Sequence, residues 1–134
     1  MSEVMKFLGD AMTPVAVSTV DGDRPRVRFF SFKMVENGNL YFITSKNKDV
    51  FKQLEKNNNI ELCSMPSQEK SWVRIEGKVE FVYDVELNKK AFEILPMLKM
   101  AYKTPENDEI VLLKITDMNI KKSDLSGKVE ELSF

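Results

Sequence analysis

The chain of 134 residues suits a single domain, expected over residues 1–134, and its 43% hydrophobic and 31% charged residues are typical of an ordinary globular protein. Its net charge of −1 argues against a large nucleic-acid-binding surface, and its apolar runs are shorter than the about 20 residues that span a bilayer. Because the sequence has no histidine, Ser–His and Cys–His catalysis are excluded and a typical zinc site is disfavoured.

The cysteine content and the first residues bear on the cellular compartment. Cys63 is the only cysteine, so no intrachain disulfide can form and a reducing environment is expected. Residues 1–10 carry acids at Glu3 and Asp10 and lack a long apolar core, which argues against a signal peptide. We therefore expect a cytoplasmic protein, and any chemistry it performs is expected to depend on a bound organic cofactor.

A helix and a meander of three strands are predicted for the first third of the chain. Apolar residues at helical spacing predict a helix over residues 1–12, which Thr13-Pro14 would end. Turn signals at Asp21–Asp23 and Glu36–Asn39 separate three segments rich in β-branched and aromatic residues. These segments predict strands at residues 14–20, 24–35 and 40–44.

The rest of the chain predicts two helices and three more strands. The helices are expected at residues 47–56, capped by Asn47, and at residues 85–102, kinked at Pro96. The strands are expected at residues 60–65, 71–83 and 109–118. The polar tail from Asn119 predicts no element.

Tight turns between consecutive strands require antiparallel pairing. Six strands of this kind close into a barrel, which removes exposed edges. The sequence therefore predicts a mainly β fold, a six-stranded antiparallel β-barrel with α-helices.

Two arginines on the second predicted strand are the first candidate site residues. Side chains alternate along a strand, so Arg26 and Arg28 share a face with Phe30, Phe32 and Met34. An arginine beside an apolar face needs a partner, and a phosphate or carboxylate would serve. Alternatively, both arginines lie at the rim and extend into solvent.

A second candidate is the segment Thr44-Ser45-Lys46-Asn47-Lys48, between a strand end and a helix start. Its hydroxyls and ammonium groups, with the free N–H groups of a helix N-terminus, would bind an anion. The alternative is a polar connector with solvated lysines.

The third candidate is Trp72, the only tryptophan, on the strand Ser71-Trp72-Val73-Arg74-Ile75-Glu76-Gly77. It lies on the face opposite Val73 and Ile75. A tryptophan outside the core is often an interface residue or a stacking platform for a flat ligand. Packing against a neighbouring element is the alternative.

Three stretches in this order resemble the pyridoxamine 5′-phosphate oxidase-like family of FMN-binding split barrels. They are PVAVSTVDGDRPRVRFFSF, LYFITSKNKDVFKQLEKNNNIEL and SWVRIEGKVEFV, which together run from Pro14 to about Tyr83. The resemblance implies a homodimer with flavin mononucleotide (FMN) in a groove between the subunits.

The resemblance also implies which residues contact FMN. The strand Arg26, Val27, Arg28 and Phe29 would contact the flavin ring through its backbone, with an arginine on the phosphate. Residues 43–48, represented by Ile43, Thr44, Ser45 and Lys48, would supply hydroxyls and a lysine to the phosphate, with Lys46 as the alternative lysine. Trp72 would reach the cofactor from the partner subunit, where the oxidases carry a glutamine.

The C-terminal tail NIKKSDLSGKVEELSF differs from the tails of the true oxidases, because it lacks the tryptophan, arginine and histidine that help to bind substrate there. We therefore expect an FMN-dependent oxidoreductase of the short flavin reductase or nitroreductase type, acting on an unidentified small molecule, with NAD(P)H as the candidate electron donor. The alternatives are a non-catalytic module that stores or senses FMN, a barrel for haem or a deazaflavin, and a barrel that binds single-stranded nucleic acid.

Overall fold

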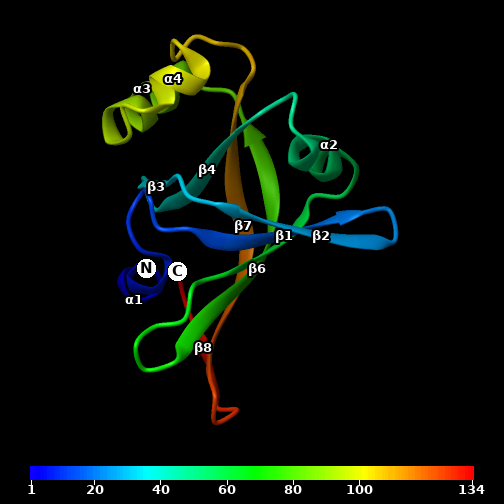
Figure 1. The fold of residues 1–134 in the computed structure, drawn as a ribbon, viewed down its shortest axis with the longest axis vertical. Helices are drawn as coiled ribbons and strands as arrows, with labels where there is room; N and C mark the ends of the chain where they lie inside the picture. The colour runs from blue at the N-terminus through cyan, green and yellow to red at the C-terminus, as the bar shows by residue number, and fades with distance from the viewer.

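The computed structural model describes residues 1–134, and strands dominate it (Figure 1). No helix is long and apolar enough to cross a membrane. The elements follow along the chain as α1 (Ser2–Leu8), β1 (Val15–Asp21), β2 (Arg24–Phe30), β3 (Lys33–Glu36), β4 (Asn39–Ser45), α2 (Asp49–Lys56), β5 (Asn59–Cys63), β6 (Ser71–Val82), α3 (Val85–Ile94), α4 (Leu98–Tyr102), β7 (Ile110–Asp124) and β8 (Val129–Leu132).

The strands form one antiparallel sheet in the order β2-β1-β5-β6-β7-β4-β3, and β8 pairs with β7. The two ends of this order, β2 and β3, follow each other in the sequence with only Ser31 and Phe32 between them. The sheet must therefore curl until its two ends meet. At this closure the ring centroids of Phe30 on β2 and Phe42 on β4, the neighbour of β3, lie 5.7 Å apart. This confirms the predicted mainly β, antiparallel barrel, with eight strands in place of six.

The prediction of one strand over residues 24–35 is wrong. The chain turns a corner at Ser31 and Phe32, so β2 and β3 lie at opposite ends of the sheet. Lys33 stabilises this corner, because its buried ammonium donates hydrogen bonds to the carbonyls of Asp10, Thr13 and Ser31 at 2.6, 2.7 and 3.2 Å. No glycine or proline stands at the corner, so the sequence carries no local signal for it.

Other boundaries also differ from the prediction. Helix α1 ends at Leu8 rather than residue 12, since Gly9 takes a φ of +79°. The last strand continues to Asp124 and forms a hairpin with β8, where the prediction ended it at residue 118. Its polar sequence carries no apolar alternation, and residues of opposite charge occupy opposing register positions at Lys121 and Glu131 and at Lys122 and Glu130. Pro96 separates α3 from α4, as predicted.

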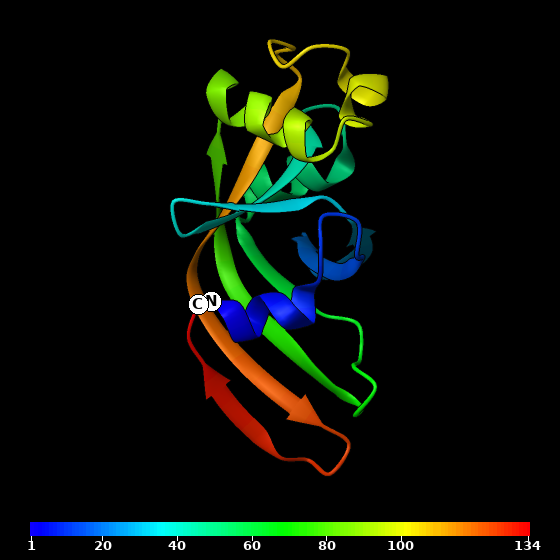
Figure 2. The ribbon, with the colours of Figure 1, turned by 90° about the vertical axis from the view of Figure 1, so that its left-hand side faces the viewer.

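Two hydrophobic cores form because β7 and β4 are buried on both faces. Val111 and Leu113 point into the barrel, where 18 buried residues pack together. Ile110 and Leu112 point the other way, into a second cluster of eight buried residues that includes Phe92 of α3 and Leu98 of α4. Figure 2 shows α3 and α4 at one end of the molecule and the β7–β8 hairpin at the other.

Helix α2 packs against the barrel and presents a polar face to the β1–β2 hairpin. Its apolar stripe, made of Val50, Phe51 and Leu54, is buried in the first core. The helix begins at Asp49 after Lys48, which takes the capping position predicted for Asn47. Figure 1 shows α2 beside the β1–β2 hairpin, and the polar residues of α2 line a groove together with that hairpin.

Gly77 is predicted to be required for the barrel curvature. It lies where the β6–β7 register shifts, and a Cβ there would lie 2.8 Å from the carbonyl oxygen of Thr116. We expect Gly77→Ala to lower the free energy of unfolding in urea by about 1–3 kcal/mol, because backbone must move. Glu80→Ala, at an exposed position of the same strand, is the control and should change stability little; equal stability of the two variants would contradict the expectation.

Candidate functional site

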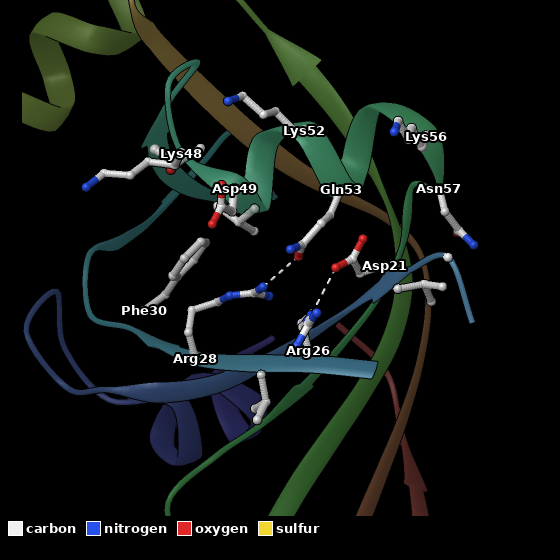
Figure 3. Close-up of a pocket in the computed structure, with 15 residues that line it drawn as sticks. Asp21, Arg26, Arg28, Phe30, Lys48, Asp49, Lys52, Gln53, Lys56 and Asn57 are labelled. Carbon is white, nitrogen blue, oxygen red and sulfur yellow. Dashed lines mark hydrogen bonds and ion pairs between the residues drawn. The ribbon is translucent and has the colours of Figure 1, made fainter. Parts of the chain in front are cut away.

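A groove of about 1000 Å³ lies between α2 and the β1–β2 hairpin (Figure 3). Three segments that are separate in the sequence build it: the first hairpin, the end of β4 and the polar face of α2. Its lining residues are Val20, Asp21, Gly22, Arg26, Val27, Arg28, Phe30, Thr44, Lys48, Asp49, Val50, Lys52, Gln53, Lys56 and Asn57.

Arg28 crosses the groove from β2 toward α2. One of its terminal nitrogens, Nη1, donates to the carbonyl of Val17 at 3.2 Å and to the hydroxyl of Thr19 at 2.8 Å. The other, Nη2, donates to Oε1 of Gln53 at 2.7 Å. Burial lowers the pKa of Arg28 and the carboxylate of Asp49 raises it, and an arginine remains charged under these influences. A fixed positive charge therefore stands inside the groove.

Arg26 behaves differently from Arg28 although both line the groove. Its Nε donates to the carboxylate of Asp21 at 3.0 Å, and both side chains of this pair are about half exposed. An exposed ion pair of this kind contributes little to stability. Arg26 therefore lies at the rim, as the alternative interpretation expected, whereas Arg28 points inward.

The segment after β4 contributes Thr44 and Lys48 to the groove. Thr44 is buried at the end of β4, and Lys48 precedes the first turn of α2, which no side chain caps. Ser45 is also buried and donates to Oδ1 of Asn47. Lys46 points elsewhere, with its ammonium 5.0 Å from the ring centroid of Tyr83. Of the two candidate lysines, Lys48 is thus the one in the groove.

Of the four remaining predicted site residues, only Val27 lines the groove. Val27 lines the groove with a side chain that is 70% exposed, and Phe29, 64% exposed, does not line it. Ile43 packs against the second core. Trp72, at the start of β6 opposite Ser123, is not among the residues that line the groove.

Helix α2 supplies lining residues that the sequence patterns did not single out. Asp49, Lys52, Gln53 and Lys56 follow helical spacing on the face opposite the apolar stripe. That spacing was a visible signal, but only the fold places this face over the first hairpin.

The charges in the groove favour an anionic ligand. Five cationic side chains line it against the two carboxylates of Asp21 and Asp49. One of these carboxylates is already paired with Arg26. No cluster of His, Cys, Asp or Glu side chains in the protein could hold a metal ion. The arrangement can therefore bind a phosphate or carboxylate group through guanidinium, ammonium, hydroxyl and helix N–H donors.

We expect inorganic pyrophosphate to raise the melting temperature of the protein at low ionic strength, since it binds the folded state only. Arg28→Met should weaken pyrophosphate binding about tenfold or more, the usual effect of losing hydrogen bonds to a charged group. Arg24→Met removes an exposed arginine outside the groove and is the matched control. Equal losses in the two variants would show that only net charge matters.

The sequence matches the model of the family described as pyridoxamine 5′-phosphate oxidase over residues 2–122. No curated protein sequence matches the chain. Among solved structures, a NimC/NimA family protein from Clostridium acetobutylicum is similar, with 26% sequence identity and a TM-score of 0.85 over 98% of this chain and 93% of that one.

Two further solved structures share the fold at lower identity. General Stress Protein 26 from Bacillus anthracis is 21% identical, with a TM-score of 0.75 over 98% of this chain and 97% of that one. An F420 reductase is 16% identical, with a TM-score of 0.61 over 83% of this chain and 90% of that one.

Proposed function

Because the chain belongs to the pyridoxamine 5′-phosphate oxidase family, we propose that it binds FMN in the groove between α2 and the β1–β2 hairpin and acts as a flavin-dependent oxidoreductase on a small molecule. The observation that carries this proposal is the meeting of Arg28, Thr44 and Lys48 in one groove, although they come from separate segments. Bound FMN would supply the electron transfer, and the protein would bind and orient it.

The donors in the groove fit a phosphate monoester. Such a phosphate carries nearly two negative charges and needs several donors. Arg28 offers a fixed guanidinium, Lys48 a flexible ammonium, Thr44 a hydroxyl, and the uncapped first turn of α2 its backbone N–H groups. Asp49 in that first turn repels an anion, so the phosphate would lie toward Arg28 and Lys48 rather than over the carboxylate.

The exposed side chains of β2 support a homodimer. β2 is an end strand of the sheet, and Val27 and Phe29 expose most of their apolar surface on it. A second subunit that covered them would remove this surface from water and exclude water from the adjacent flavin ring. In this proposal the backbone of residues 26–29 and the β4 end, from Ile43 through Ser45, contact FMN in one subunit, and Trp72 approaches it from the other.

The family and the composition of the groove support the proposed reaction class. The groove contains no histidine or cysteine, and in this proposal its arginine, lysine and threonine side chains bind and orient FMN, which supplies the redox chemistry. A flavin reductase or nitroreductase type of activity, with electrons from NADH or NADPH, is compatible with a protein that only binds and orients the flavin.

Purified protein should bind FMN in a saturable manner, shown by flavin absorbance and by release of FMN on denaturation. Anaerobic addition of NADH or NADPH should then bleach the bound flavin, because an oxidoreductase must accept electrons at this site. A flavin that binds but resists both donors would indicate the non-catalytic alternative. Protein that FMN cannot saturate would refute the proposal.

Lys48→Ala should weaken FMN binding about tenfold or more, since a charge-assisted hydrogen bond to the phosphate is lost. Fluorescence titration with FMN measures this effect. Lys46→Ala is the matched control, because it removes the same charge two residues away, where the side chain packs on Tyr83. The assignment of the phosphate site is wrong if Lys46→Ala weakens binding and Lys48→Ala does not.

A further inference from the structure

Gln53 on α2 joins this helix to both strands of the first hairpin. Its Oε1 accepts a hydrogen bond from the hydroxyl of Thr19 on β1 at 2.6 Å and another from Nη2 of Arg28 on β2 at 2.7 Å. Thr19 is only 2% exposed, and Gln53 itself belongs to α2. Figure 3 shows the side chains of Gln53 and Arg28 pointing toward each other across the groove.

The direction of these hydrogen bonds leaves one consistent arrangement. Arginine can only donate, so the atom of Gln53 that faces Arg28 must be its oxygen. The hydroxyl of Thr19 accepts from Nη1 of Arg28 and donates its own hydrogen to the same oxygen. Arg28, Thr19 and Gln53 therefore form a closed ring of hydrogen bonds that fixes the plane of the guanidinium.

All the groups that accept hydrogen bonds from Arg28 are neutral. Arg28 donates to a backbone carbonyl, a hydroxyl and an amide oxygen, and it takes part in none of the ion pairs of the protein. Asp49 influences it from a distance without a direct contact. A partly buried cation without a carboxylate partner costs stability, so an arrangement that leaves it unpaired calls for an explanation.

We propose that Gln53 is a positioning residue that holds the guanidinium of Arg28 ready for an anionic ligand while leaving its positive charge uncompensated. A glutamate at this place could accept the same two hydrogen bonds, but its charge would cancel that of Arg28. The neutral amide keeps the geometry and spares the charge for the ligand. Where that ligand is the phosphate of FMN, the inference rests on the proposed function.

The variant Gln53→Glu separates geometry from charge. Its carboxylate accepts from Thr19 and Arg28 as the amide does, so the ligand-free protein should melt at the same or a higher temperature than the wild type. The affinity for FMN should nevertheless fall about tenfold or more, since the phosphate then meets a neutralised guanidinium. A purely structural role for Gln53 predicts instead that stability and affinity change together.

Gln68→Glu is the matched control. Gln68 is the other glutamine of the chain, exposed in the loop between β5 and β6 and outside the groove, and its substitution adds the same charge. We expect this variant to keep both the melting temperature and the FMN affinity of the wild type. The inference is overturned if Gln53→Glu binds FMN as tightly as Gln68→Glu does, or if it loses melting temperature and affinity together.

The outcome for Gln53 can be distinguished from the outcome for the proposed function. If the wild type does not bind FMN, the proposed function fails, and inorganic pyrophosphate replaces FMN as the titrant. Weaker binding of pyrophosphate to Gln53→Glu than to Gln68→Glu, with melting temperature retained, still supports the positioning role. Equal binding of pyrophosphate to both variants overturns it.

Discussion

The corner at Ser31 and Phe32 brings the two end strands of the sheet, β2 and β3, together. The groove can form only when the sheet is closed in this way. β2 lies at one end of the sheet, and β4 lies next to β3 at the other. Because β2 and β3 are joined by two residues, the curl of the sheet carries the end of β4, and α2 after it, back over the first hairpin. Arg28 and Lys48 face the same groove only in this closed form. The buried ammonium of Lys33, bonded to three carbonyls at the corner, stabilises the closure.

The sequence was most informative where the hydrophobic pattern was regular. The apolar stripe of α2 and the break at Pro96 were predictable, because the first follows from periodicity and the second from the missing N–H of proline. The corner after β2 was not predictable, since its apolar residues continue the strand pattern and the interactions that bend the chain come from distant residues. The β7–β8 hairpin was missed for the opposite reason: polar residues on both faces leave no pattern.

The candidate site was predictable in its parts and not in its assembly. Arg28 and Lys48 stood out as anion-binding residues in the segments that carry the family resemblance, and the structure places both in the groove. Gln53 had no such signal, because a glutamine on the polar face of a helix is ordinary until Thr19 and Arg28 are seen beside it. Sequence identities of 26%, 21% and 16% to the three solved structures fix the fold more firmly than the ligand.

The groove lies where the curled sheet closes, so a ligand bound there would stabilise the folded protein and slow its degradation. An anion held by both Arg28 and Lys48 would add a link between β2 and the segment after β4, beside the hydrogen bonds that Gln53 already makes. A ligand present at one hundred times its dissociation constant adds about 2.7 kcal/mol to the stability of the state that binds it. Proteolysis acts on transiently opened chains, so molecules lacking a bound anion would be degraded first, and the amount of this protein in a cell would follow the availability of that ligand.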